Sequence, residues 1–381
     1  MKFIHTSDWH IGRQFHNISL LDDQRYVLHQ LIDYIRQESV DALIIAGDIY
    51  DRAIPPAAAV QLLDEVLNTI CLDLSVPVIL IPGNHDSAGR LSFAANQLKQ
   101  AGLYILGDLA KVAQPVIIKN KHESCCFYGI PYNDPEHVRH QFDVELTDHN
   151  DAHAYLIKQV HKGWDENQAN IVISHCFVDG AEQSESERPL SIGGADRVSG
   201  DLFEKFDYAA LGHLHGPQYK VARHIRYSGS ILKYSFSEQN HNKGVTLVEL
   251  ENNKLKDFRH LPLKPLHEMR IVEGELESIL QQGRVDPNFE DYLLVRLTDK
   301  HAILDAMGKL RDVYPNVLHL EKPGMMTETG THEVDREKIK RSELEMFQDF
   351  FNQTTGNELT ELQSKAIQQT ISRLHHSKEH G

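Results

Sequence analysis

The sequence predicts an α/β protein whose first and largest domain is built on a mostly parallel sheet. Over the first hundred residues, apolar runs typical of buried strands alternate with amphipathic stretches typical of helices. This βαβαβ order is typical of parallel strands joined by helices that pack on the sheet. With 381 residues, the chain is also longer than one hydrophobic core usually serves, so smaller units should follow the first.

The individual elements follow from apolar periodicity and from turn residues. Near the start of the chain we expect strands at 2–7, 41–46 and 76–81, alternating with helices at 21–38, 55–70 and 91–100. Further on we expect short strands at 115–119 and 125–130, a helix at 152–167, and strands at 170–174, 207–211, 225–228 and 244–250. A long polar loop should span 182–200, and Asn252-Asn253 should form a hairpin turn.

The last third of the sequence predicts two smaller parts. Strands at 269–272, 292–297 and 317–320, with helices at 275–282 and 301–313, predict a small α+β unit after a proline-containing linker. Helices at 342–351 and 358–374 should form a tail. The predicted division is therefore 1–265, 266–326, a linker at 327–341, and a helical tail at 342–381.

The amino-acid composition excludes several classes of protein. A hydrophobic content of 41% with 25% charged residues is typical of a soluble globular protein. The start of the chain becomes polar too early for a signal peptide, and no apolar run reaches membrane-spanning length, so we expect a cytoplasmic protein without membrane contact. The four cysteines show neither a disulfide framework nor zinc-site spacing. A net charge of −16 disfavours a protein that coats nucleic acid, but it is compatible with a nuclease whose carboxylates bind metals.

Residues of metal-binding type follow five of the predicted strands. The stretch Pro82–Asp86, which ends one strand, places an amide, an imidazole and a carboxylate side by side. Two pairs are spaced two residues apart, which in an extended chain projects both side chains to the same side. The seven candidate ligands are Asp8, His10, Asp48, Asn84, His175, His213 and His215. In a mostly parallel sheet these strand ends would share one edge, where α/β proteins bind their ligands.

A mixture of carboxylate, amide and imidazole ligands favours a divalent ion such as Mn²⁺, with Fe and Zn as alternatives. Seven ligands are too many for one ion with open positions, so two ions that share a carboxylate, about 3.5–4 Å apart, fit better. Each motif alone also has an ordinary structural explanation: a turn for Gly47-Asp48, or a partly buried histidine for His175. Their occurrence together, each after a strand, favours the metal site.

These motifs resemble the signature of the calcineurin-like metallophosphoesterases. The resemblance rests on Asp8-x-His10, Gly47-Asp48-x-x-Asp51, Gly83-Asn84-His85-Asp86, His175 and Gly212-His213-x-His215. More closely, the stretches 6–12, 46–51, 187–194 and 226–230 resemble the SbcD family of bacterial nuclease subunits. The resemblance implies a β-sandwich flanked by helices, followed by a small α+β capping domain and a helical C-terminal tail.

The resemblance also implies roles for individual residues. One ion would be bound by Asp8, His10, Asp48 and His215, and the other by Asp48, Asn84, His175 and His213, with Asp48 bridging. His85 would contact the scissile phosphate and help to protonate the leaving oxygen. Asp86 would orient a histidine from behind. Asp51 stands where some relatives carry a phosphate-positioning histidine, so its role stays open.

By the same resemblance, the substrate is DNA, cut as an exonuclease on duplex ends and as an endonuclease on single strands or hairpins, near the nucleoid. Cations that could contact the DNA backbone are Arg188, Arg197, Arg223, Arg226 and Lys233. The tail would bind an SMC-like ATPase of the SbcC type, and the helices at 57–70 and 90–101 would pair two copies in a homodimer within a heterotetramer. A small-molecule phosphodiesterase or phosphatase and a non-catalytic DNA-end scaffold remain alternatives.

Overall fold

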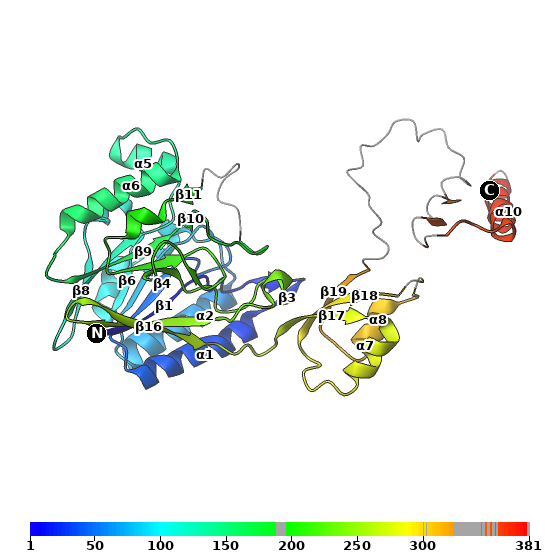
Figure 1. Ribbon diagram of the computed structural model, residues 1–381, viewed down its shortest axis with the longest axis horizontal. Helices are drawn as coiled ribbons and strands as arrows, with labels where there is room; N and C mark the ends of the chain where they lie inside the picture. The colour runs from blue at the N-terminus through cyan, green and yellow to red at the C-terminus, as the bar shows by residue number, and fades with distance from the viewer. Residues whose placement is uncertain are drawn as a thin grey trace. The chain divides into compact units, whose positions relative to one another are not determined.

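The computed structural model describes residues 1–187, 196–299, 301, 303–322, 344, 347–348, 351–352, 355 and 357–378. The chain divides into two compact units, Met1–Leu266 and His267–Gly381 (Figure 1). Among the described residues, no helix is both long and apolar enough to cross a membrane.

The first unit contains two six-stranded sheets. The first sheet has the strand order β16-β15-β1-β4-β5-β6. Its strands β1, β4, β5 and β6 are parallel, whereas β15 pairs antiparallel with β1 and β16 pairs antiparallel with β15. The strands are β1 (Lys2–Thr6), β4 (Ala42–Ala46), β5 (Val78–Ile81), β6 (Leu103–Ile105), β15 (Gly244–Glu251) and β16 (Lys254–Pro262).

The second sheet has the order β13-β14-β12-β9-β8-β7. Its inner strands are parallel and both edge strands are antiparallel to their neighbours. The strands are β7 (Val116–Lys119), β8 (Ser124–Ile130), β9 (Ala169–His175), β12 (Tyr208–Gly212), β13 (Gln218–Tyr219) and β14 (Ile225–Tyr227). Two small ribbons complete the unit: β2 (Gln14–Phe15) with β3 (Ile18–Ser19), and β10 (Phe177–Val178) with β11 (Arg197–Val198).

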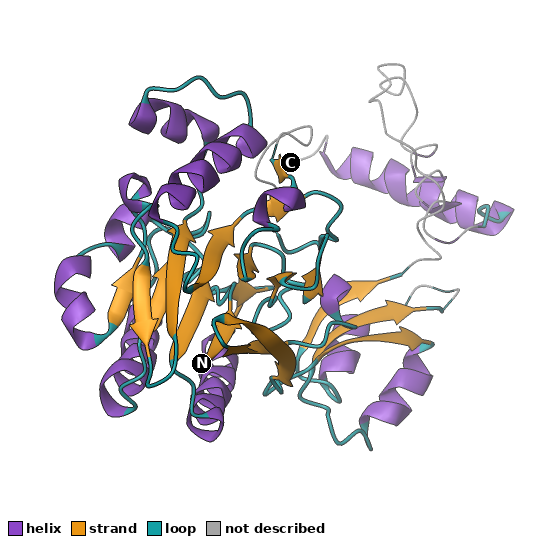
Figure 2. Ribbon diagram, turned by 60° about the vertical axis from the view of Figure 1, so that its left-hand side comes forward, coloured by secondary structure: helices purple, strands orange, loops and turns teal. Residues whose placement is uncertain are grey.

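The two sheets pack face to face over a continuous apolar core. Residues of both sheets form this core, including Phe3, Ile44 and Ile79 from the first sheet and Phe127 and Tyr208 from the second. Helices cover the outer faces: α1 (Leu21–Glu38) and α2 (Ala57–Asn68) on one side, and α5 (Pro135–Phe142) and α6 (His149–Val160) on the other (Figures 1 and 2). The predicted sandwich flanked by helices is confirmed, and it is a pair of mixed sheets rather than one mostly parallel sheet.

Most predicted elements of the first unit are present, and the main differences concern the helices. The helix expected at 91–100 is broken into α3 (Ala88–Leu91) and α4 (Ala95–Leu98), because Ala94 between them adopts a left-handed conformation (φ 57°). Helix α6 begins at His149 rather than 152, because Asp148 accepts a capping hydrogen bond from the Asp151 amide, and it ends at Val160 rather than 167. Helix α5 was not predicted. The hairpin turn at Asn252-Asn253 is confirmed, with φ of 54° and 60°.

The second unit begins with a three-stranded parallel sheet of order β17-β18-β19. Its elements are β17 (Met269–Gly274), α7 (Leu276–Gly283), β18 (Tyr292–Leu297), α8 (Ala306–Arg311) and β19 (Val317–Glu321). This confirms the predicted α+β unit. Helix α10 (Glu361–Lys378) overlaps the second tail helix. The predicted linker at 327–341 and much of the first tail helix lie outside the described residues.

The contact of Phe3 with both sheets provides a test of the sandwich core. Phe3 is fully buried, with its ring centroid 5.5 Å from Phe127 and 5.7 Å from Tyr208. Phe3→Ala should therefore lower the free energy of unfolding by about 3–5 kcal/mol in a urea titration. Ile117→Ala on β7, where the side chain is 46% exposed, is the control and should cost far less. Equal losses for the two variants would contradict the assigned core.

Candidate metal centre

The candidate site lies where loops from both sheets meet. Asp8, Asp48 and Asn84 follow β1, β4 and β5 of the first sheet, whereas His175, His213 and His215 come from the ends of β9 and β12 in the second. Backbone hydrogen bonds connect these loops, from the Asp8 amide to the Gly47 carbonyl (3.1 Å) and from the His10 amide to the Asp48 carbonyl (3.0 Å). The His213 amide donates to both Asp8 carboxylate oxygens, at 3.1 and 3.2 Å, and this joins the two sheets.

The backbone at the site is held in an unfavourable conformation. Four of the candidate ligands have a positive φ: Asp8 (53°), His10 (45°), Asp48 (50°) and His213 (106°). Such conformations cost free energy in non-glycine residues and persist only when the surrounding structure fixes them. Their concentration at one point is typical of a functional site.

Two glycines allow the loops to approach so closely. A Cβ atom on Gly212 would lie 1.8 Å from the Ala46 carbonyl oxygen, and one on Gly83 would lie 2.2 Å from Asp48 Oδ1. Any side chain at these positions would push the two loops apart. The glycines of the Gly-Asn-His-Asp and Gly-His-x-His motifs are therefore required by close packing around the ligands.

One group of ligand atoms gathers around Asp8, His10 and His215, whose ligand atoms all lie within 4.8 Å of one another. All three residues are buried. The Nε2 atoms of His10 and His215 are 3.1 Å apart, and His10 Nε2 is 3.6 Å from Asp48 Oδ2. Imidazole nitrogens that face each other beside carboxylates form the donor set of a cation site.

A second group gathers around Asp8, Asp48 and His175. His175 Nε2 lies 2.9 Å from Asn84 Oδ1 and 3.5 Å from Asp48 Oδ2. His213 lies beside it, with its ring centroid 5.4 Å from that of His175. Its Nε2 atom is buried and has no hydrogen-bond partner within the described structure, which a bound cation would supply. Asp48 contacts members of both groups, as a bridging carboxylate must.

The electrostatics of the site fit cation binding. Burial lowers the pKa of His10 and His213 well below the usual value, so both imidazoles are neutral and can donate an electron pair. Burial would raise the pKa of Asp48, but the neighbouring histidines His175, His10 and His85, with His175 foremost, together hold this pKa well below the usual range. Asp48 is therefore ionised. Burial would lower the pKa of His175, but the Asp48 carboxylate raises it to about 9, so His175 gives up a proton when it binds a cation. With that proton released, the donor set of carboxylates, amide oxygen and imidazoles fits two divalent cations.

His85 lies beside the first group, where its ring contacts His10 edge to face at a centroid distance of 4.7 Å. Its Nδ1 atom donates to the Asp51 carbonyl oxygen at 2.8 Å, which fixes the ring and leaves Nε2 as the nitrogen available to a substrate. Its backbone amide donates to Asp48 Oδ1 at 2.9 Å. His85 also forms a third group of potential ligands with His10 and Asp51, whose ligand atoms lie within 4.8 Å of one another, so its role as a phosphate contact rather than a ligand stays a prediction.

Asp86 does not orient a histidine, so that prediction was wrong. Its two carboxylate oxygens accept hydrogen bonds from the backbone amides of Ile49 (3.0 Å), Tyr50 (2.9 Å) and Gly83 (2.9 Å). It therefore ties the loop after β4 to the loop after β5. The Asp86 carboxylate thus binds backbone amides rather than another side chain, and in this way it fixes the positions of the loops that carry Asp48 and Asn84.

The predicted phosphate-binding cations are less well placed. Arg188 lies outside the described residues. Arg197 pairs with Asp179 at 2.8 Å, and the guanidinium groups of Arg223 and Arg226 lie over the Phe258 ring. Lys233 Nζ donates to the Gln239 carbonyl oxygen at 2.7 Å. All four described cations thus have contacts within the protein, and contact with DNA stays a prediction.

Sequence reasoning missed two other cations near the site. Arg13 donates to Asp51 Oδ1 at 3.2 Å, and its guanidinium lies 5.1 Å from the centre of the Tyr234 ring. In the sequence, only its position three residues after His10 indicated that Arg13 could lie near the site. Lys243 forms a buried ion pair with Glu238 behind His215. Neither residue belongs to a motif, so only the fold could have revealed this pair.

Comparison with known proteins agrees with this geometry. The calcineurin-like phosphoesterase model matches residues 1–217, and the model described as type 5 capsule protein repressor C-terminal domain matches residues 265–355. A protein of Staphylococcus saprophyticus, named as the SbcD component of nuclease SbcCD, is 38% identical over 375 residues, covering 98% of both chains. One of the same name from Staphylococcus epidermidis is 35% identical over 373 residues, again covering 98% of both. The chain therefore belongs to the calcineurin-like phosphoesterase family, and within it to the SbcD group of nuclease proteins.

Proposed function

We propose that the chain is a metal-dependent DNA nuclease subunit that hydrolyses phosphodiester bonds together with an SMC-like ATPase, SbcC. The convergence of six ligand-type side chains from two sheets around Asp48 is the observation that supports phosphoester hydrolysis most directly. The similarity to the two staphylococcal nuclease proteins extends over 98% of the chain and supports DNA as the substrate.

The ligand assignment divides the seven side chains between two ions, and Asp8, which lies in both groups of ligand atoms, is assigned to the first. Asp8, His10, Asp48 and His215 would hold one divalent ion, and Asp48, Asn84, His175 and His213 the other. We propose Mn²⁺ for both, because the mixture of oxygen and imidazole nitrogen donors suits it. When bound, the pair would supply a water molecule of lowered pKa and neutralise charge that develops on the phosphoryl oxygens.

The chain's own residues would position the phosphate. His85 is held by the Asp51 carbonyl, so its Nε2 atom can bind the scissile phosphate and protonate the leaving oxygen. The Asp51 carboxylate repels phosphate, and its role is therefore indirect: it holds the Arg13 guanidinium at the site through the 3.2 Å hydrogen bond. Arg13 is the cation that we assign to the phosphate at this edge of the site.

We further propose that the activity is exonucleolytic on duplex ends and endonucleolytic on single strands and hairpins, with the unit at 266–326 as a capping domain that contacts DNA. The C-terminal helices would bind the ATPase, because an amphipathic helix can lie in a partner's groove. Leu362 on α10 is 83% exposed and is available for such a contact.

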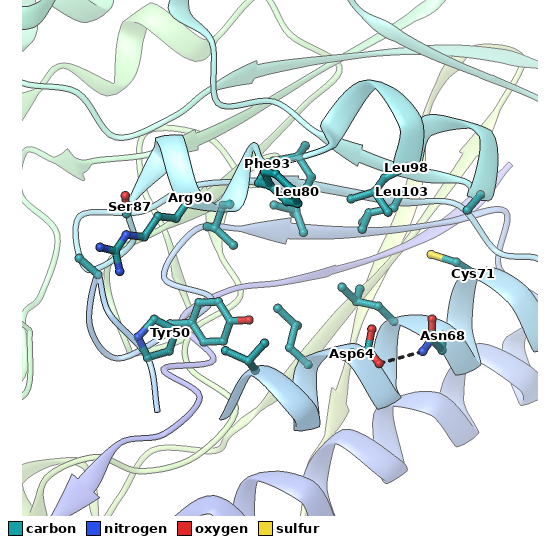
Figure 3. Close-up of a pocket in the computed structure, with 18 of the residues that line it drawn as sticks. Tyr50, Asp64, Asn68, Cys71, Leu80, Ser87, Arg90, Phe93, Leu98 and Leu103 are labelled. Carbon is teal, nitrogen blue, oxygen red and sulfur yellow. Dashed lines mark hydrogen bonds between the residues drawn. The ribbon is translucent and has the colours of Figure 1, made fainter. Parts of the chain in front are cut away.

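An apolar groove in the first unit supports a homodimer. The groove has a volume of about 600 Å³ and lies between α2 and the segment that contains α3 and α4 (Figure 3). Large apolar side chains at or near it are exposed: Phe93 (82%), Ile54 (65%) and Leu72 (58%). Such a patch on a soluble protein marks an interaction surface. We propose that a second copy of the chain occupies it, through the helices predicted to pair at 57–70 and 90–101.

The role of His85 can be tested by DNA cleavage. With Mn²⁺, the wild-type protein should cut end-labelled hairpin or linear duplex DNA, and His85→Ala should slow cutting by at least about 10²–10⁴-fold, the usual contribution of a general acid. Metal analysis of the variant should still find two ions, because His85 is not a ligand. His122→Ala, at an exposed position, is the control.

Two results would redirect the assignment. Hydrolysis of bis-p-nitrophenyl phosphate without cleavage of any DNA, even with the ATPase present, would favour the small-molecule phosphodiesterase. A wild-type protein that binds DNA ends but hydrolyses neither substrate would favour the non-catalytic scaffold.

Removal of the tail tests the partner. A chain that ends at Lys340 should not bind the ATPase in a pull-down or by calorimetry, because α10 is absent. Its basal cleavage of DNA should equal that of the full chain, because all the candidate ligands lie in the first unit. An undiminished complex would rule out the tail as the docking element.

The exposed Phe93 side chain tests the dimer. Phe93→Asp should raise the dimer dissociation constant by at least about 30-fold in analytical ultracentrifugation, as expected for the loss of an interface hot spot of about 2 kcal/mol. Val285→Asp, an equally exposed apolar position in the second unit (81%), is the matched control. A monomeric wild-type protein, or a Phe93→Asp variant that still dimerises, would contradict the proposed interface.

A further inference from the structure

A charged pair is buried directly behind the candidate metal centre. Glu238 Oε2 lies 2.5 Å from Lys243 Nζ, and the side chains are 0% and 4% exposed. Glutamate and lysine are almost never buried in this way unless they are paired. A buried ion pair is also weak evidence for stability, since apolar residues of similar size often serve as well. The location of the pair, rather than its contribution to stability, indicates its role.

The pair and a neighbouring segment hold His215 at three points. The His215 amide donates to Glu187 Oε1 at 2.7 Å, and its carbonyl oxygen accepts from Lys243 Nζ at 2.7 Å. Its Nδ1 atom lies 2.6 Å from Ser186 Oγ. The backbone on both sides of the imidazole and the imidazole itself are therefore fixed.

The direction of these hydrogen bonds follows from the ion pair. Ser186 Oγ contacts Glu238 Oε1 as well as His215 Nδ1. A carboxylate paired with lysine can only accept, so the Ser186 hydroxyl donates to Glu238. The hydroxyl oxygen then accepts from Nδ1–H of His215. In this tautomer, His215 Nε2 has no proton and faces His10 Nε2, 3.1 Å away.

We propose that Glu238, paired with Lys243 and acting through Ser186, is a positioning residue that fixes the tautomer and orientation of His215 for metal binding. Carboxylates behind metal-bound histidines commonly act in this way. The inference rests on the proposed two-metal function and extends it to residues outside the motifs.

The backbone of His10, on the same candidate ion, is held by Asp48 at the amide and by Gln24 at the carbonyl oxygen, but its imidazole lacks equivalent support. Its Nδ1 atom is 3.7 Å from Asp51 Oδ1, beyond hydrogen-bond range, and it has no hydrogen-bond partner within the described structure. His215 is thus the histidine of this group whose imidazole the protein holds through Nδ1. Loss of the Glu238 network should therefore weaken the ion at Asp8, His10 and His215 and leave the ion at Asn84, His175 and His213 in place.

The test is a Mn²⁺ titration of the full-length protein, in which calorimetry and electron paramagnetic resonance measure the binding of each ion. Glu238→Gln and Ser186→Ala should raise the dissociation constant of one ion by about 10–100-fold, the usual cost of losing such a partner, with the other ion unchanged. Ser186→Thr, which keeps the hydroxyl, should restore binding. Glu185→Gln, exposed in the same segment, is the control.

Because Glu238→Gln leaves Lys243 buried without its partner, the double variant Glu238→Gln/Lys243→Met provides a folded alternative. In metal-free protein, ¹⁵N chemical shifts should show His215 protonated at Nδ1 in the wild type and as a mixture of tautomers in Ser186→Ala. A purely structural role would lower the melting temperature without changing the tautomer or the single-ion affinity.

The experiments distinguish failure of the positioning role from failure of the proposed function. Variants that bind both ions as the wild type does, with an unchanged His215 tautomer, would overturn the positioning role while leaving the nuclease assignment intact. A wild-type protein that does not bind two ions, or does not cut DNA, would instead overturn the proposed function.

Discussion

Asp48 joins the two sheets of the first unit, and the organisation of the site depends on its carboxylate. Oδ2 lies 3.6 Å from His10 Nε2 and 3.5 Å from His175 Nε2, whereas Oδ1 accepts the His85 amide. A buried carboxylate of this kind would be costly without charge nearby. The imidazolium of His175, whose pKa Asp48 raises to about 9 against the effect of burial, provides that compensation in the protein itself, and two bound cations would provide it more completely.

The rest of the fold stabilises this arrangement, which is unfavourable in free energy by itself. Positive φ angles at Asp8, His10, Asp48 and His213 are unfavourable, and so is the burial of their polar side chains. The apolar core between the sheets and the helices on their outer faces hold the loops together. Asp86, which accepts three backbone amides, and Gly212, which lets β12 approach Ala46, then adjust the loops locally. The strain is concentrated where the chemistry takes place.

The sequence predicted the features that depend on local patterns of residues, namely the strands, most helices and the candidate ligands. Apolar runs located the strands, and helix α1 matched its prediction of 21–38. Motif spacing identified the ligand-type residues that the structure brings together. It could not show that they come from two sheets, because β9 and β12 pair with each other and with β8 and β14, and local spacing does not reveal which strands pair. For the same reason it could not place Glu238 behind His215, and it assigned Asp86 to a histidine although its partners are backbone amides.

The claim that two ions bind on either side of Asp48 is tested most directly by crystals of the protein soaked in Mn²⁺. An anomalous difference map should show two peaks about 3.5–4 Å apart, one beside Asp8, His10 and His215 and the other beside Asn84, His175 and His213. A single peak, or two peaks that do not share Asp48 as a ligand, would contradict the account.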